Sequence, residues 1–216
     1  MHPQIDQRRK PMVIAHRGAS GYRPEHTLAA YALAARMGAD CIEPDLVATR
    51  DGVLVARHEN EISGTTDVAT HPEFAELWCT KTVDGRSLTG WFVEDFTLTQ
   101  LRTLRAVERL PDLRPGNTAT DGVWGIATFA EILTLRAALS EELGRELVVY
   151  PELKHPAHLR AAGLATEEMI VNELAAFGLL GRDRPVWIQC FEPATLTRLR
   201  HELGVESPLL HLMAAG

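Results

Sequence analysis

Short apolar runs rich in β-branched residues alternate with helix-like segments along most of the chain. Strands are predicted over residues 12–16, 41–47, 53–58, 147–153, 186–190 and 209–213. Helices are predicted over residues 28–37, 128–143, 167–177 and 193–203. Thr27 and Thr128 are placed to cap the first two helices, and a glycine follows each predicted helix. Strands and helices alternating at this spacing predict βαβ units on a parallel sheet, and therefore an α/β protein.

Residues 59–126 interrupt this alternation. Gly, Thr, Asp and Pro punctuate the stretch, and one short helix capped by Thr97 is predicted over residues 98–107. Because so long a loop region in a compact domain is usually functional, we expect a lid or binding insert. Its aromatic residues are expected to form a small hydrophobic cluster, the alternative being a ligand-recognising lid: Trp78, Trp91, Phe92 and Phe96.

Composition and charge exclude several classes of protein. With 22 basic and 29 acidic residues the net charge is −7, so no nucleic-acid or anionic-lipid partner is expected. The 45% hydrophobic and 24% charged residues are typical of soluble globular proteins, and no apolar run reaches the ~18–20 residues of a membrane span. Cys41, Cys79 and Cys190 lack the spacing of a zinc or redox site, and Cys41 and Cys190 are expected to be buried thiols.

The N-terminal ten residues are polar and lack the apolar stretch of a secretory signal. The sequence as given therefore predicts a cytoplasmic protein, or a periplasmic or secreted one if a leader has been removed.

Polar side chains occur at the C-terminal ends of the predicted strands. In chain order they are His16, Glu43 with Asp45, His58, Glu152 with Lys154, and Gln189. One such residue is more often hydrogen-bonded or solvated than catalytic, but five successive strands share the feature. In a (β/α)₈ barrel these ends converge on one mouth, where the active site lies. The pattern therefore predicts one site.

The acidic members of this series indicate a metal. Glu43, Asp45 and Glu152 offer only carboxylate oxygens, which hard cations such as Ca²⁺ or Mg²⁺ prefer and zinc does not. Burying these charges together without a cation would be costly.

The basic members indicate phosphoester chemistry. His16 and His58 are suited to general acid and general base roles near neutral pH. Arg17 and Lys154 supply positive charge for an anionic, phosphate-like group. A metal, an acid–base pair and a cationic clamp together predict phosphoester cleavage.

Several segments, in order, resemble the signature of the glycerophosphodiester phosphodiesterase family, and the resemblance runs from about Val13 to Met213. They are His16-Arg17-Gly18-Ala19, Pro24-Glu25-His26-Thr27, Glu43-Pro44-Asp45-Leu46, Thr49-Arg50-Asp51-Gly52, Val55-Ala56-Arg57-His58, Tyr150-Pro151-Glu152-Leu153-Lys154 and Gln189-Cys190-Phe191. The Pro-Glu-His-Thr variant and the long insert are most similar to the bacterial long-insert branch, whose members are typically exported and calcium-dependent.

The resemblance implies a TIM barrel that hydrolyses glycerophosphodiesters to sn-glycerol 3-phosphate and an alcohol. It implies that Glu43, Asp45 and Glu152 bind one divalent cation, with Ca²⁺ expected ahead of Mg²⁺. It further implies that His16 and His58 form the acid–base pair and that a substrate-binding set contacts the phosphodiester: Arg17, Lys154 and Gln189. His155 and His158, the closest-spaced of the other histidines, are expected to be surface residues beside Pro156.

The chain departs from the family pattern in two places. Family members usually have His-Asp where this chain has His58-Glu59, and only six strands are predicted before Gly216. We therefore expect residues 11–216 to form one C-terminally incomplete barrel domain, with residues 59–126 as an insert and with open edges prone to self-association. The alternatives to a glycerophosphodiesterase are a non-catalytic or truncated relative, or a phospholipase D-like activity on lysolipids.

Overall fold

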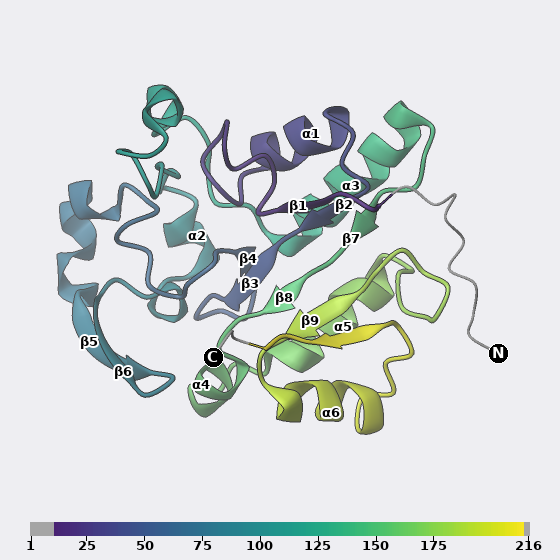
Figure 1. Ribbon diagram of the computed structural model, residues 1–216. Helices are drawn as coiled ribbons and strands as arrows, with labels where there is room; N and C mark the ends of the chain where they lie inside the picture. Colours follow the sequence, from purple (N-terminus) through teal and green to yellow (C-terminus); the bar gives the residue numbers. More distant parts are fainter. Residues whose placement is uncertain (1–10, 214–216) are drawn as a thin grey trace.

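A wall of mostly parallel strands runs through the centre of the protein in the computed structural model, which describes residues 11–213 (Figure 1). One sheet has the order β1 (Ile14–His16), β2 (Cys41–Glu43) and β7 (Val148–Val149). The other has the order β10 (Leu209–His211), β9 (Ile188–Cys190), β8 (Glu152–Leu153), β3 (Asp45–Ala48) and β4 (Leu54–Ala56). All of these neighbours are parallel except β3 and β4.

The two sheets are one continuous wall. The strand predicted over residues 41–47 is divided at Pro44, which has no N–H to donate to a ladder. The ladder nevertheless continues across the division, because the Glu152 N–H donates to the Pro44 carbonyl at 2.9 Å and the Lys154 N–H to the Leu46 carbonyl at 3.0 Å. Glu43 and Asp45 therefore lie at the junction, where β2 passes into β3.

The helices connect these strands as the sequence predicts. They are α1 (Leu28–Arg36), α3 (Phe129–Leu143), α5 (Thr166–Ala176) and α6 (Pro193–His201), with an additional short α4 (Pro156–Ala161). Thr27 caps α1, and Thr128 with Glu131 forms a capping box on α3, so these predictions are confirmed. The parallel strands contribute fully buried side chains to the core, among them Ile42, Leu46 and Val149.

The prediction for the third strand is wrong in direction. β4 pairs antiparallel to β3, with Leu46 opposite Ala56, and is not a further parallel strand. The connection is too short for the crossover of a dozen or more residues that a parallel partner needs. It is a tight turn in which Gly52 has φ +77° and the Thr49 N–H donates to the Val53 carbonyl. His58 consequently approaches the site from the opposite chain direction.

The insert has regular structure that the sequence reading did not predict. Its hairpin pairs β5 (Cys79–Val83) with β6 (Arg86–Gly90), and Asp84 and Gly85 form the turn, both at positive φ. The predicted helix over residues 98–107 ends early, as α2 (Leu98–Leu101). Of the predicted aromatic cluster, Phe92 and Phe96 are fully buried, whereas Trp78 is half-exposed and packs edge-on against Trp91, with ring centroids 4.4 Å apart. The remaining insert helices are short 3₁₀ turns over Val68–Thr70, Pro72–Leu77, Val93–Asp95 and Pro115–Thr120.

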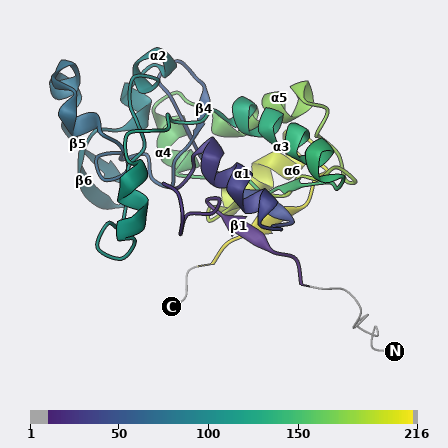
Figure 2. The same ribbon diagram turned by 90° about the horizontal axis from the view of Figure 1, so that it is seen from above.

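The insert leaves and rejoins the wall at neighbouring points. The Ala56 N–H of β4 donates to the Ala127 carbonyl at 2.9 Å, and Val55 forms a bridge with Thr128. In the view from above, β5, β6 and α2 lie to one side of α1 and α3 (Figure 2). The insert therefore projects from the wall without separating its strands.

The α/β class is confirmed. Among residues 11–213, β1 and β10 are each paired on one side only, so the closed eight-stranded barrel stays a prediction. Cys41 and Cys190 are buried free thiols, as expected. No helix in the described part of the chain is both long and apolar enough to cross a membrane.

Candidate active site

The predicted site residues converge where the parallel strands end. His16 closes β1, Glu43 closes β2 and Asp45 opens β3. Their carboxylate and imidazole ligand atoms lie within 4.8 Å of one another, which makes them a group able to hold a metal ion. Glu43 and Asp45 are almost completely buried. The structure thus brings together side chains that lie up to 29 positions apart in the sequence.

Glu152 lies beside this group and is not part of it in the structure described for residues 11–213. It is the register partner of Asp45 in the β3–β8 pair. Its Oε1 forms an ion pair of 2.7 Å with Lys154 Nζ, which also lies 3.4 Å from Asp45 Oδ1. The Lys154 ammonium therefore sits between the two carboxylates that were predicted to share a cation.

The electrostatics of the carboxylates fit a divalent cation. Burial and the neighbouring Asp45 raise the pKa of Glu43 to about 9, and the same two causes raise the pKa of Glu152 to about 7. Both shifts are caused first by burial and then by the adjacent carboxylate, and a cation bound beside Glu43 and Glu152 would oppose both causes. Asp45 Oδ1 is buried and accepts no hydrogen bond from the described residues. A buried group of carboxylate oxygens of this kind suits Ca²⁺ or Mg²⁺.

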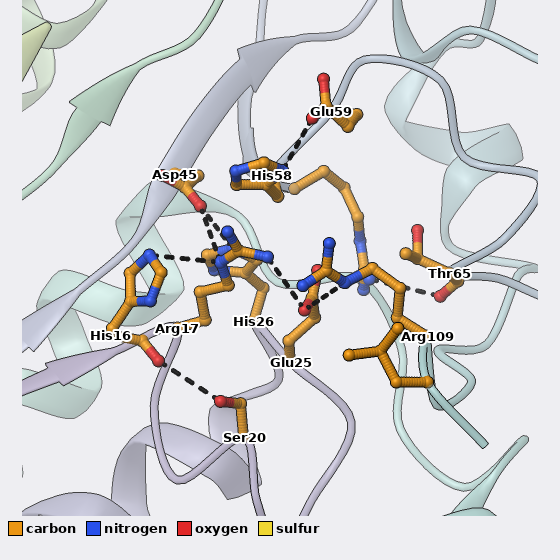
Figure 3. A network of polar contacts seen from close by, with 12 residues as sticks. His16, Arg17, Ser20, Glu25, His26, Asp45, His58, Glu59, Thr65 and Arg109 are labelled. Carbon is orange, nitrogen blue, oxygen red and sulfur yellow. Dashed lines mark hydrogen bonds and ion pairs between the residues drawn. The ribbon is translucent and has the colours of Figure 1, made fainter. Parts of the chain in front are cut away.

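Arg17 occupies the turn that follows β1. Its backbone is left-handed at φ +62°, and its N–H donates to Glu43 Oε2 at 3.1 Å. The guanidinium contacts Glu25 at 3.2 Å, Asp45 at 3.5 Å and His16 Nε2 at 3.3 Å, as Figure 3 shows. The predicted phosphate ligand is thus held against the carboxylate group by side chains of its own loop.

Gly18 explains how that loop packs. Its φ is +81°, and an added Cβ would approach the backbone of Ala30 to 2.7 Å. The loop after β1 therefore lies directly on α1, which is possible only without a side chain at this position. The close packing fixes the backbone on which His16 and Arg17 stand.

His26 is a site residue that the sequence reading missed. It is fully buried, with Nε2 2.9 Å from Asp45 Oδ2 and Nδ1 2.7 Å from the Tyr31 hydroxyl. A carboxylate only accepts, so His26 Nε2 donates to Asp45. Burial lowers the pKa of His26, and Nδ1 of the neutral ring then accepts a hydrogen bond from the Tyr31 hydroxyl. The one signal available was its place in the Pro24-Glu25-His26-Thr27 segment.

Gln189 contacts a carboxylate in this structure. Its Nε2 donates to Glu43 Oε1 at 2.7 Å, and the residue is buried in β9. A direct substrate contact for Gln189 stays a prediction. The observed contact instead orients the carboxylate of Glu43, which belongs to the group able to hold a metal ion.

His58 stands at the rim of a cavity of about 610 Å³ beside the carboxylates. The cavity lies between the β5–β6 hairpin and the segment that joins β8 to α4. Its lining includes His58, Glu59, Asp84, Glu152, Lys154 and His155. His58 Nδ1 lies 2.8 Å from Glu59 Oε1, and in Figure 3 His58 and His16 lie on different sides of the central guanidinium.

The expectation that His155 and His158 are plain surface residues is wrong. Only 14% of the His155 side chain and 19% of the His158 side chain are exposed. Both form ion pairs with carboxylates of the insert, His155 with Asp84 and His158 with Glu94. Spacing in the sequence gave no indication of these contacts because the partners lie more than 60 positions away.

Comparison with known proteins points in one direction. Residues 16–216 match the family model described as the glycerophosphoryl diester phosphodiesterase family. The chain is 35% identical over 219 residues to glycerophosphodiester phosphodiesterase GDPD6 of Arabidopsis thaliana, covering 96% of this chain and 56% of that protein. It is 33% identical to the glycerophosphodiester phosphodiesterase of Haemophilus influenzae, covering 94% and 57%. The chain therefore spans a little over half the length of these relatives.

Solved structures share the fold. A phosphodiesterase of Oleispira antarctica, in complex with the product sn-glycerol-3-phosphate, aligns with a TM-score of 0.67 at 23% identity and covers 95% of this chain and 67% of its own. A glycerophosphodiester phosphodiesterase of Agrobacterium tumefaciens aligns with a TM-score of 0.56 at 24% identity, covering 88% and 62%.

Proposed function

Since the chain belongs to the glycerophosphoryl diester phosphodiesterase family, we propose that it hydrolyses glycerophosphodiesters to sn-glycerol 3-phosphate and an alcohol with a divalent cation. The observation that carries the proposal is the convergence of His16 and His58 on a buried carboxylate group flanked by two cationic side chains, Arg17 and Lys154. The product complex of the Oleispira antarctica phosphodiesterase supports the choice of product.

Glu43 and Asp45 are proposed to hold the cation, with Glu152 joining them when Lys154 turns to the substrate. Hard cations favour oxygen ligands, so His16 is assigned to proton transfer although its ring reaches the same group. A bound Ca²⁺ or Mg²⁺ would orient the glycerol oxygens and offset charge on the phosphate. Calcium is proposed ahead of magnesium.

Arg17 and Lys154 are proposed to bind the phosphate. Each is nearly buried and now neutralises a carboxylate of the group. With a cation held by the carboxylates, the guanidinium and the ammonium would be free to donate to phosphate oxygens. The site then holds a diester anion without leaving a buried charge unpaired.

The position of the cavity supports different roles for the two histidines in the proposed reaction. His58 lines the cavity and His16 does not, so the cavity would receive the alcohol and His58 would protonate the departing alcohol oxygen. His16 would take the proton of the neighbouring glycerol hydroxyl, whose oxygen bonds to phosphorus as the bond to the alcohol breaks. In the second half His58 takes a proton from water, which opens the cyclic phosphate, and His16 returns its proton to the glycerol oxygen.

Phosphorus-31 NMR of purified protein with glycerophosphocholine and 1 equivalent or more of Ca²⁺ or Mg²⁺ tests the proposal. We expect sn-glycerol 3-phosphate to accumulate, and kcat to fall by ~10²–10⁴ in His16→Ala and in His58→Ala, the usual worth of acid–base catalysis. His71→Ala, which changes an insert histidine that does not line the cavity, is the control. Wild-type kcat in both His16→Ala and His58→Ala would refute their assignment as the acid–base pair. Turnover of lysophosphatidylcholine but not of glycerophosphocholine would replace glycerophosphodiesters by lysolipids as the substrate class.

A further inference from the structure

A chain of four polar side chains leads from His58 to the tip of the insert hairpin. His58 Nδ1 lies 2.8 Å from Glu59 Oε1, and Glu59 Oε2 lies 3.1 Å from His155 Nε2. On the other side of the ring, His155 Nδ1 lies 2.6 Å from Asp84 Oδ2. All four residues line the same cavity, and the first link is drawn in Figure 3. The proposed acid is therefore connected to the insert through side chains alone.

The members of this chain come from three segments far apart in the sequence. Glu59 follows His58 after β4, His155 lies between β8 and α4, and Asp84 is in the turn of the β5–β6 hairpin. His155 has φ +48°, a left-handed backbone that costs a non-glycine residue on the order of 1 kcal/mol. That conformation places the imidazole between two carboxylates, one from each neighbouring segment.

Charge is distributed so that each imidazole faces a carboxylate. Burial opposes a charge on His155, but its hydrogen bonds with Glu59 and Asp84 outweigh burial and raise the pKa of His155. The hydrogen bond with His155 and the close contact with His58 lower the pKa of Glu59 well below its usual range. Glu59 Oε1 lies 2.8 Å from Nδ1 of His58, but the pair lacks the alignment of a hydrogen bond in this structure. Once aligned, a carboxylate at this distance would fix the ring and stabilise its imidazolium form, leaving Nε2 for the leaving alcohol.

The insert has a second, independent attachment to the same region. Glu94 is buried and contacts His158 of α4 at 2.9 Å, Lys81 of β5 at 3.1 Å and Asn60 at 3.1 Å. These contacts anchor the hairpin whether or not Asp84 and His155 are paired. Changes in the four-residue chain can therefore alter the orientation of His58 without releasing the insert.

We propose that Glu59 is a positioning residue for His58 and that His155, held by Asp84, fixes Glu59 in turn. The insert hairpin then sets the orientation of the group that protonates the leaving alcohol. This inference rests on the proposed function, because it assigns His58 that role. It also gives the Glu59 side chain a length requirement, since one carboxylate has to reach both imidazoles.

Three variants remove the links while keeping the backbone. Glu59→Gln removes the charge, His155→Asn retains a residue that tolerates φ > 0, and Asp84→Asn keeps a favoured Asn-Gly hairpin turn. The matched control is Glu73→Gln with His71→Asn, a histidine–carboxylate pair of the same insert at 3.0 Å that does not line the cavity.

We expect kcat on glycerophosphocholine to fall ~10-fold in Glu59→Gln and His155→Asn, with less effect in Asp84→Asn and none in the control. KM should stay within about twofold, because the phosphate-binding cations are unchanged. A p-nitrophenyl ester of glycerol phosphate should restore most of the loss, since its leaving group needs little protonation. General structural damage would slow both substrates equally.

Long-range ¹⁵N–¹H NMR of histidine-labelled protein reports the same link without turnover. We expect His58 to carry its proton on Nδ1 in the wild type and to shift toward a tautomer mixture in Glu59→Gln. An unchanged tautomer, or equal losses on both substrates, would overturn the inference. An inactive wild type whose His58 tautomer still depends on Glu59 would instead refute the proposed function and leave the positioning contact in place.

Discussion

Replacing His26 by Leu removes the imidazole that connects Asp45 to Tyr31. The imidazole is fully buried, and both of its nitrogens have partners, at 2.9 Å and 2.7 Å. Two groups lose a partner in the variant. The Tyr31 hydroxyl is left unpaired in the interior, and the Asp45 carboxylate keeps only the more distant Arg17, at 3.5 Å, and Lys154, at 3.4 Å.

The expected cost follows from these contacts. A buried hydroxyl without a partner costs ~1–3 kcal/mol, and a lost hydrogen bond to a charged group costs ~1.5–3 kcal/mol. His26→Leu should therefore lower the free energy of unfolding by ~3–6 kcal/mol, and Tyr31→Phe, which leaves only Nδ1 unpaired, by ~1–3 kcal/mol. In the double variant neither the hydroxyl nor Nδ1 remains, so both unpaired-group penalties vanish and its cost should be smaller than the sum by ~2–6 kcal/mol.

Urea unfolding in excess EDTA, followed by tryptophan fluorescence, measures the free energy of unfolding of the wild type, the two single variants and the double variant. EDTA keeps a bound cation from changing the stability of Asp45 between variants. Additivity within ~0.5 kcal/mol would show that the two side chains are not coupled, and that the contact between His26 and Tyr31 does not stabilise the fold. The phosphodiesterase rate of Tyr31→Phe with Ca²⁺ shows whether the same link affects the site.

Three further outcomes are expected. Burial raises the pKa of Glu173 from its unfolded value of 4.5 to about 7, so its contribution to stability is lost as pH rises from 4.5 to 7. At pH 8 the Glu173→Gln variant should therefore melt at a higher temperature than the wild type, by the equivalent of ~1–2 kcal/mol after solvent screening. At pH 4 the variant and the wild type should melt at the same temperature. Calcium affinity measured by isothermal titration should fall ~10-fold or more in Glu43→Gln, and an unchanged affinity would exclude Glu43 as a ligand. The exposed edges at β1 and β10, each paired on one side only, should make residues 1–216 self-associate. Light scattering after size exclusion should show oligomers, and Val13→Lys should reduce their amount. A monomer at all concentrations would contradict the prediction.

Local signals account for the parts of the fold that could be predicted. The Thr27 cap, the Thr128–Glu131 capping box and Gly144 mark the ends of α1 and α3, because a cap satisfies backbone groups within a few residues of itself. The apolar runs likewise located the wall strands. The position of polar residues at strand ends then sufficed to bring His16, Glu43 and Asp45 to one place.

Strand direction and distant partners were not accessible in the same way. Periodicity identifies β4 as a strand but carries no information on its pairing, which the short turn at Gly52 decides. Asp84-Gly85 is a local hairpin signal, because Asp-Gly favours the tight turn that joins β5 and β6. His26 is tied to the site by Asp45, 19 positions away, and His155 contacts Asp84 and Glu59, at least 71 positions away, so spacing along the chain could not reveal these roles.

The meeting of β4 with the start of α3 has a consequence for how such a chain diversifies. The segment between them begins and ends at one hydrogen bond, from Ala56 to Ala127. Doubling the length of a loop closed in this way adds only ~0.6 kcal/mol of entropy cost. A lineage can therefore lengthen or shorten this cassette while the wall strands and His16 stay where they are. Since Asp84, Arg86 and Leu88 of the cassette line the cavity and His58 stands at its start, such changes would alter both the surface proposed to receive the alcohol and the surroundings of the proposed acid.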